Sequence, residues 1–209
     1  HYHKLTELFT NLQSEKLHSQ FEALKSQVNP HFLFNSLNVL SSLVHIDSDL
    51  SEKFIDKLAK SYRYVLEQKD NELVLLKTEI EFLHSFAFLM KIRFEDKILW
   101  KINVDETKQQ FFIPPLTLQI LVENAIKHNI ISKDSPLIIE IFNDEEDNLF
   151  IRNNYQPHEN GTNSTGIGFK NIMNRYIFFT KKPVEYGVKN EYFVVKIPLI
   201  NLISKNLTL

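Results

Sequence analysis

Hydrophobic positions in the first part of the chain follow a helical spacing. Apolar residues recur every three or four positions along residues 5–28, again along residues 54–65, and a third time along residues 80–88. This spacing puts side chains on one face of a helix. The polar residues 47–49 separate the first two stripes, and Asp49 or Ser51 is available to cap the helix that follows. Because a hairpin of two helices cannot bury both of its apolar stripes, the pattern favours dimerisation into a four-helix bundle.

From residue 98 the pattern changes to alternation. Apolar residues at every second position predict strands at residues 98–104, 137–142 and 149–151, with the acidic residues 144–147 as a solvated turn. Residues 116–128, preceded by Pro114 and Pro115, and residues 168–179 have helical spacing. Residues 184–188 and 192–199 predict a closing hairpin around Gly187. We therefore expect an α+β chain, with helices over residues 1–96 and a mixed helix-and-sheet domain over residues 97–209.

Composition narrows the classes of function. The chain has 209 residues, 43% of them apolar, which is enough for one large core or two ordinary ones. Its formal net charge of -2 gives no basic field of the kind that nucleic-acid binding needs, and the absence of cysteine excludes disulfides and thiolate sites. No apolar run reaches the roughly 18 residues of a membrane span. Three of the four glycines lie within residues 161–168, where we expect chemistry that depends on backbone geometry.

A proline interrupts the helical pattern at residue 30. Proline inside a helix costs about 3 kcal/mol, so a helix that keeps one has either a boundary or a use for it. His31 follows directly, and Asn35 lies one turn further on the same face. A neutral imidazole is a nucleophile that can accept a phosphoryl group, and an amide one turn away can position water against it. The alternative is a partly exposed histidine of a helix bundle.

A second polar constellation lies in the helix predicted over residues 116–128. Asn124, Lys127 and His128 have the spacing that places an amide oxygen, an ammonium and an imidazole on one face. Magnesium held together with phosphates prefers hard oxygen ligands, and lysine binds phosphate as a point charge. An ordinary polar face on a surface helix is the alternative.

The glycine cluster precedes the helix predicted from residue 168. A glycine turn that leads into a helix N-terminus presents free N–H groups to an anion such as a triphosphate. The stretch of residues 162–171 is neither a Walker loop nor a dinucleotide-binding fingerprint, because the lysine-serine end and the third glycine are absent. A plain tight turn is the alternative.

Taken together and in this order, these motifs resemble sensor histidine kinases of the LytS type. The phospho-acceptor box of that family is similar to residues 29–35, and the resemblance continues through residues 91–94, 113–115, 121–128 and 165–171. It implies a dimerisation and histidine-phosphotransfer hairpin, followed by a two-layer α/β sandwich of the Bergerat ATPase type. It also implies ATP and Mg²⁺ as cofactors, a homodimer, and a response regulator as partner. A cytoplasmic portion of a bacterial inner-membrane protein, attached to the membrane through preceding segments, would then be the location.

The resemblance also implies roles for individual residues. His31 would be the phosphorylated residue, and Asn35 would take the place at which related kinases orient the water for phosphatase activity. Asn124 would coordinate magnesium, and Lys127 and His128 would contact the phosphates. The other residues expected to bind the nucleotide are Asn153, Thr165, Gly166 and Gly168.

The chain departs from this family at the adenine region. Asn153 replaces an aspartate that accepts a hydrogen bond from the adenine amino group, and Tyr155 and Pro157 replace two glycines. We therefore expect weaker nucleotide binding, by about 1 kcal/mol, because an amide oxygen lacks the charge of a carboxylate. Residues 155–165 are expected to form a mobile lid.

The general base for His31 is not identified by the sequence. Phe32 stands where many histidine kinases have an acidic residue, and Glu123 is a conceivable candidate.

The expected activity is ATP-dependent autophosphorylation of His31 and transfer to an aspartate of the regulator. A catalytically weak dimeric scaffold and a module that mainly dephosphorylates its regulator are the alternatives.

Overall fold

The computed structural model describes residues 30–68, 70–158 and 167–202. The chain divides into two compact units, His1–Ile55 and Asp56–Leu209. In the first unit, helix α2 (Pro30–Leu43) is followed by α3 (Ser48–Glu67), which runs into the second unit. The apolar stripe of residues 5–28 lies outside the described residues. The predicted cap of α3 was wrong, because Asp47 accepts a bond from the Leu50 backbone N–H at 2.9 Å.

Apolar side chains remain exposed on the two helices of the hairpin. Phe34 is 67% exposed and Leu37 46%, while Ile46, in the connection between the helices, is 80% exposed. Isolated exposed apolar residues are ordinary, but several on one small element indicate a surface that is covered by something else. The dimeric bundle that would cover it stays a prediction.

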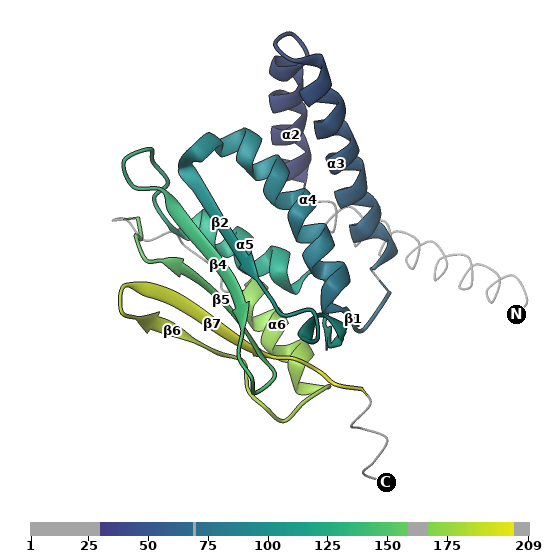
Figure 1. The fold of residues 1–209 in the computed structure, drawn as a ribbon, viewed down its shortest axis with the longest axis vertical. Helices are drawn as coiled ribbons and strands as arrows, with labels where there is room; N and C mark the ends of the chain where they lie inside the picture. Colours follow the sequence, from purple (N-terminus) through teal and green to yellow (C-terminus); the bar gives the residue numbers. More distant parts are fainter. Residues whose placement is uncertain (1–29, 69, 159–166, 203–209) are drawn as a thin grey trace, which may run out of the picture. The chain divides into compact units, whose positions relative to one another are not determined.

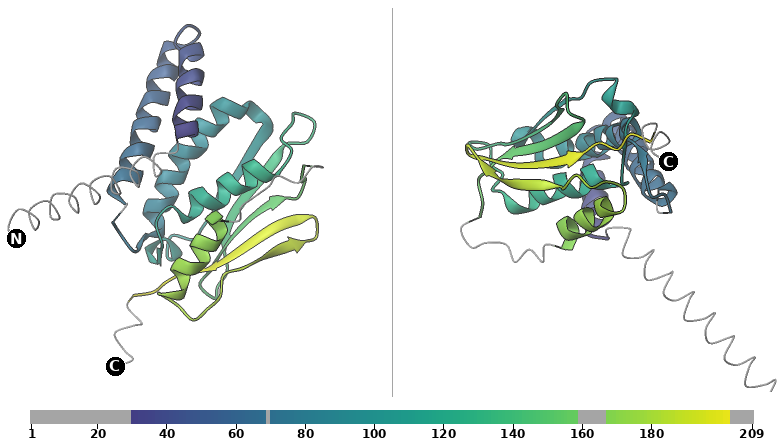
Figure 2. Two further views of the ribbon diagram at one scale, coloured as in Figure 1. Left: turned by 180° about the vertical axis from the view of Figure 1, so that it is seen from behind. Right: turned by 90° about the horizontal axis from the view of Figure 1, so that it is seen from below.

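The second unit is built on a five-stranded sheet (Figure 1). Its order is β2 (Ile98–Asn103), β4 (Leu137–Asn143), β5 (Asn148–Asn154), β7 (Tyr192–Pro198) and β6 (Glu185–Lys189). The β2–β4 pair is parallel and the other neighbours are antiparallel. Three helices lie together on one face of this sheet, as both views in Figure 2 show: α4 (Leu76–Phe94), α5 (Thr117–His128) and α6 (Ile167–Ile177). The α+β class and the two-layer arrangement are therefore confirmed.

Two short elements complete the second unit. A two-stranded antiparallel ribbon joins β1 (Val74–Leu75) to β3 (Phe112–Ile113), and so brings the start of α4 next to the start of α5. Single turns of 3₁₀-helix lie at Glu95–Lys97 and Lys108–Gln110.

The core of the second unit lies between the sheet and its helices. Alternate residues of the central strands are fully buried, namely Leu137, Ile139, Ile141 and Leu149. From the helices, Leu83, Leu118 and Val122 are equally inaccessible. The period of two along the strands is the pattern that predicted them, because one face of each strand packs on helices.

Helix α4 belongs to the unit that contains the sheet. Its side chains Leu83, Phe86 and Leu89 are buried, and α4 packs against α5 and β2. The division between the compact units falls between Ile55 and Asp56, whereas we expected a boundary near residue 96 from the change in periodicity. A helical stripe that packs on a sheet has the same spacing as one that packs on helices, so periodicity does not distinguish them. The functional boundary at residue 96 stays a prediction.

The closing hairpin turns at a different place from the one predicted. Gly187 lies inside β6, with nothing within 4 Å of the position that a Cβ would take. The turn is made by Asn190 and Glu191, whose φ angles of 48° and 64° are both left-handed. Two successive left-handed residues match the twist of a two-residue hairpin, so the glycine is not needed there.

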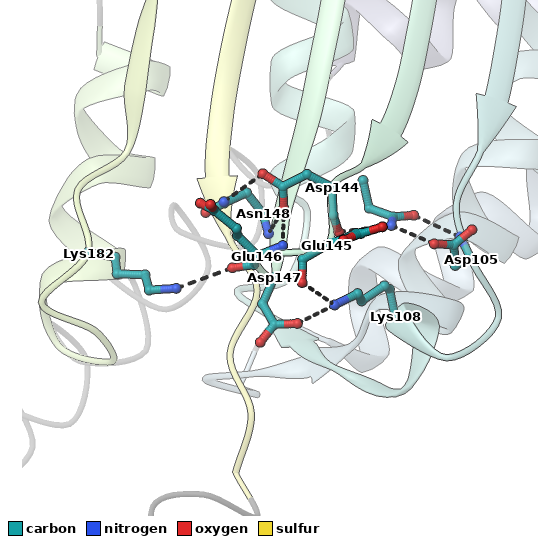
Figure 3. A network of polar contacts seen from close by, with 9 residues as sticks. Asp105, Lys108, Asp144, Glu145, Glu146, Asp147, Asn148 and Lys182 are labelled. Atoms are coloured by element: carbon teal, nitrogen blue, oxygen red, sulfur yellow. Dashed lines mark hydrogen bonds and ion pairs between the residues drawn. The ribbon is translucent and has the colours of Figure 1, made fainter.

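The acidic turn between β4 and β5 is confirmed, and it is anchored by polar contacts (Figure 3). Asp144 accepts bonds from the backbone N–H groups of Glu146 and Asn148, both at 2.9 Å. Lys108 donates to the carbonyl of Glu145 at 3.2 Å and pairs with Asp147. Lys182 donates to the carbonyl of Glu146 at 3.3 Å. The turn is thus held by lysines from two other segments.

Candidate functional site

A cavity of about 590 Å³ opens between the helix layer and strands β5, β6 and β7. Its volume lies within the range of small-molecule sites. One side is formed by residues of α5 and the position after it, Leu121, Asn124, Ala125, Lys127, His128 and Asn129. The opposite sides are formed by residues of α6 and of the strands, among them Asn153, Gly168, Phe169, Tyr186 and Phe193.

Helix α5 contributes the polar side of the cavity. Asn124 and His128 are half-buried and Lys127 is exposed, and all three line the cavity. The helical period brings them to one wall, as their spacing predicted. The roles expected of them, magnesium coordination and phosphate contact, stay predictions.

His128 lies in a setting that favours the neutral ring. Burial lowers its pKa from the ordinary value, and the neighbouring charges of Lys127 and His158 lower it further. A neutral imidazole can donate one hydrogen bond and accept another, whereas the protonated ring only donates.

Asn153, the predicted adenine contact, lies on β5 in the wall of the cavity. It is 3% exposed, and its side-chain nitrogen donates to the carbonyl of Asn154 at 2.6 Å. The side-chain oxygen is therefore the half of the amide that is left to accept a hydrogen bond from a ligand. This polarity fits the hydrogen bond that the sequence led us to expect.

The described start of the predicted lid is fixed by hydrogen bonds. The Tyr155 N–H donates to the carbonyl of Glu191 at 2.7 Å, and the Gln156 N–H donates to the side-chain oxygen of Asn129 at 2.9 Å. Pro157 forms an antiparallel bridge with Asn129. Residues 155–157 are thus tied to the end of α5 and to the β6–β7 turn. The rest of the predicted lid, with Thr165 and Gly166, lies outside the described residues.

Gly168 lies at the start of α6, where it lines the cavity and also permits close packing. A Cβ at this position would come within 3.3 Å of Cγ2 of Ile120 on α5. The glycine therefore sets how closely α6 approaches α5. The sequence indicated a glycine for nucleotide contact, and it gave no sign of this second constraint.

Aromatic side chains that the sequence did not single out form the apolar side of the cavity. The rings of Phe169 and Tyr186 meet edge to face with centroids 4.2 Å apart, and Tyr186 and Phe193 are 6.4 Å apart. Tyr186 is 57% exposed although it lies in a strand. The signal available in the sequence was an aromatic residue, Tyr186, within the strand predicted over residues 184–188. We interpreted that stretch only as half of a closing hairpin.

The predicted phospho-acceptor lies in the other unit. His31 is the second residue of α2, and Asn35 follows one turn later and is half-buried. Glu123, the conceivable general base, lies on α5 beside Gln119, whose side-chain nitrogen donates to it at 2.9 Å. Burial raises the pKa of Glu123, and the bond from Gln119 opposes that rise. Glu123 does not line the cavity.

Among the described residues there is neither a metal-ligand cluster nor a helix suited to a membrane. Within residues 30–68, 70–158 and 167–202, no three His, Cys, Asp or Glu side chains are grouped so that they could hold a metal ion. Over the same residues, no helix combines the length and the apolar character needed to cross a bilayer.

Comparison with known proteins shows which family this chain is related to. A family model described as histidine kinase matches residues 19–98. The sensor protein LytS of Oceanobacillus iheyensis is 30% identical over 203 residues, which is 87% of this chain and 35% of that protein. LytS of Bacillus subtilis is 38% identical over 118 residues, 56% of this chain and 20% of that protein. This chain belongs to the LytS-type sensor histidine kinases.

A further relative and a solved structure are similar to parts of this chain. The sensor histidine kinase YpdA of Escherichia coli is 38% identical over 112 residues, 54% of this chain and 20% of that protein. The catalytic domain of histidine kinase ThkA superposes with a TM-score of 0.39 at 17% identity, over 60% of this chain and 93% of that one. The chain spans about a third or less of the length of the curated relatives named here.

Proposed function

We propose that this chain is the cytoplasmic catalytic portion of a sensor histidine kinase. It binds ATP with Mg²⁺, phosphorylates itself on His31 and passes the phosphoryl group to an aspartate of a response regulator. The observation that carries this proposal is the cavity of about 590 Å³ in which Asn124, Lys127 and His128 line one side and Asn153 another. Its two ends differ in chemistry in the way that the two ends of a nucleotide do.

The apolar end of the cavity suits a base. Phe169, Tyr186 and Phe193 supply ring surface, and the side-chain oxygen of Asn153 is available to accept from an exocyclic amino group. Buried hydrogen-bonding groups of this kind give specificity, because a ligand that lacks the matching group leaves them unpaired.

The α5 side suits phosphates. Lys127 supplies a positive charge, and the side-chain oxygen of Asn124 is a hard ligand for Mg²⁺. ATP supplies the phosphoryl group, and the chain contributes position and charge neutralisation, which dominate phosphoryl transfer. A nitrogen of the neutral His31 ring attacks the terminal phosphorus as the bond to the leaving oxygen breaks, and the ring proton passes to solvent or to a base.

Partners and location follow from the same proposal. The exposed apolar residues of α2 and of its connection to α3 support a homodimer that buries them in a four-helix bundle. The regulator aspartate would receive the phosphoryl group from His31. Attachment to the inner membrane would come from segments outside this chain.

Incubation of the chain with labelled ATP and Mg²⁺ tests the proposal. We expect an acid-labile label on the wild type, none on His31→Ala, and none on Asn124→Ala. Equal labelling of His31→Ala would contradict the assignment of the phospho-acceptor. Labelling absent from the wild type, with ATP binding intact in calorimetry, would contradict the kinase activity for this chain.

A dimeric scaffold is the second candidate, and the adenine region favours it. Asn153, Tyr155 and Pro157 all differ from the residues expected of an ATP-binding member of the family. Calorimetry separates the candidates, since a scaffold would bind no ATP–Mg²⁺ at millimolar concentration.

A third candidate, a module that mainly dephosphorylates its regulator, rests on the position of Asn35 one turn after His31. Asn35→Ala would then remove phosphatase activity alone.

A further inference from the structure

A fully buried carboxylate lies on α4, outside the cavity. Glu79 has no exposed surface, and three hydrogen-bond donors converge on it. The Leu116 N–H and the Tyr64 hydroxyl both donate to Oε1, at 2.6 and 2.5 Å. The Leu118 N–H donates to Oε2 at 3.1 Å. Buried acids are rare unless they are paired, so a side chain in this position requires a reason.

The reason lies at the N-terminus of α5. Leu116 occupies the N-cap position with a left-handed backbone, φ 64°, and its side chain provides no cap. The first N–H groups of a helix have no partner within it and attract negative charge. Glu79 therefore provides, from α4, the cap that α5 lacks in its own sequence.

All three contacts of Glu79 are donors, so the carboxylate is the form that they fit. Burial raises the pKa of Glu79, while the bonds from Tyr64, Leu116 and Leu118 and the charge of Arg175 oppose that rise. Arg175, on α6, also donates to the carbonyl of Pro115 at 3.0 Å. The start of α5 is thus held from α4 on one side and from α6 on the other.

Tyr64 brings a fourth helix to the same carboxylate. It lies on α3, is 8% exposed, and stacks on Phe82 of α4 with centroids 4.5 Å apart. Its hydroxyl and the Leu116 N–H share one oxygen of Glu79. A change in the position of α3 therefore alters the group that caps α5.

We propose that Glu79 is a positioning residue for the nucleotide site, and that Tyr64 makes the position of α5 depend on α3. Asn124, Lys127 and His128 lie two to three turns along α5 from the capped end, and a helix transmits a displacement of its end along its axis. The inference rests on the proposed function in that it takes the α5 wall to bind nucleotide. It goes further by assigning a link between that wall and α3, the helix that follows the phospho-acceptor helix along the chain.

Substitutions in the full chain test the link. Tyr64→Phe removes one hydroxyl and leaves both backbone bonds to Glu79. Tyr176→Phe is the matched control, because Tyr176 is 2% exposed and its hydroxyl has no partner among the described residues. We expect Tyr64→Phe to lower the rate of autophosphorylation at saturating ATP about tenfold, while the dissociation constant for ATP–Mg²⁺ stays within about twofold. Tyr176→Phe should change neither.

Glu79→Gln tests the cap itself. An amide places an N–H₂ group against donors, so we expect ATP–Mg²⁺ to bind about tenfold more weakly, a loss of the size of one capping interaction. The amide protons of Leu116 and Leu118 should also exchange faster with solvent than in the wild type, as measured by NMR. If Glu79→Gln does not fold, faster exchange of the Leu116 amide in Tyr64→Phe than in Tyr176→Phe supports the cap, and equal exchange contradicts it.

The outcomes separate this inference from the proposed function. A wild type that binds ATP but takes no label overturns the kinase activity, whereas the amide exchange of Glu79→Gln still tests the cap. Unchanged exchange at Leu116 and Leu118 together with unchanged ATP affinity would overturn the role of Glu79. Identical labelling rates for Tyr64→Phe and Tyr176→Phe, in a wild type that does label, would overturn the link to α3.

Discussion

One end of the Asn153 side-chain amide is hydrogen-bonded to the next residue of the strand, and the other end is available to a ligand. Its nitrogen donates to the carbonyl of Asn154 at 2.6 Å, an interaction that an aspartate could not make. The residue that departs from the family at this position thus fits its own backbone surroundings. From the sequence, only the lost charge was visible, because the neighbouring carbonyl is positioned by the strand geometry.

Asn153→Asp should therefore have two opposite effects. A carboxylate oxygen would face the Asn154 carbonyl, which lowers the free energy of unfolding by about 1–2 kcal/mol, the cost of an unsatisfied buried acceptor. In the folded protein the negative charge would tighten ATP binding about fivefold, because charged acceptors make stronger hydrogen bonds. Urea denaturation and calorimetry measure the two effects separately. A variant that is both more stable and weaker in ATP binding would contradict this account of the site.

The stability of the chain should depend on pH through His128. Because burial, Lys127 and His158 lower its pKa, the unfolded chain binds a proton more readily than the folded one. Stability from this residue is complete above the ordinary value of 6.5 and is lost as the pH falls below it. His128→Gln should flatten the profile of urea midpoint against pH between pH 7 and 5.5. His84→Gln, at an exposed position, is the control substitution.

At the scale of elements, the periodicity of the sequence located every strand of the large sheet and the helices α5 and α6. Where an element packs one face on the common core, burial imposes a period of 2 or 3.6. Strand β6 is the exception, because it is exposed along its whole length. What it missed leaves no periodic signal in the sequence. Glu79 caps a helix 37 residues away, and the two left-handed residues of the last turn, Asn190 and Glu191, carry no glycine.

The two described glycines should respond differently to alanine. Gly168→Ala brings a Cβ within 3.3 Å of Cγ2 of Ile120, so the Ile120 side chain or α6 must shift by a few tenths of an ångström. Gly187→Ala meets nothing within 4 Å and removes backbone freedom from the unfolded chain. We expect thermal unfolding to show Gly187→Ala unchanged or raised by about 2 °C, and Gly168→Ala lowered by a similar amount. Gly168→Ala should also bind ATP more weakly, and equal melting temperatures would contradict the close packing of α5 and α6.

Replacing Asp144 should destabilise the acidic turn of residues 144–147. Burial alone would raise the pKa of Asp144, but the hydrogen bonds from Asn148 and Glu146 outweigh it and hold the pKa below its ordinary value. Asp144→Asn keeps the shape and weakens these charged bonds, so we expect a loss of about 1 kcal/mol in the free energy of unfolding. Glu145→Gln, in the same turn and exposed, is the control. The difference between the variants should shrink as the pH falls below the ordinary pKa of 3.8 and Asp144 takes up its proton.

For the molecule as a whole, the proposed dimer depends on the hairpin of α2 and α3. Phe34→Glu, at a position that is 67% exposed, should shift the chain toward monomer in sedimentation velocity at micromolar concentration, because a charge is costly in a desolvated interface. Phe178→Glu is the matched control, since Phe178 is 81% exposed but lies in the other unit. A wild type that is monomeric at every accessible concentration would contradict the bundle. Equal dissociation of both variants would place the interface elsewhere.

The oxygen that Tyr64 and Leu116 share on Glu79 constrains how this sequence can change over time. Losing the acid leaves two backbone N–H groups and a hydroxyl without partners, and losing the tyrosine leaves the acid with fewer donors. Each substitution is therefore costly alone and cheaper together with a change at the other position. Homologues should accordingly vary at residues 64 and 79 in concert, and a chain that acquires its own capping side chain at position 116 should be released from both.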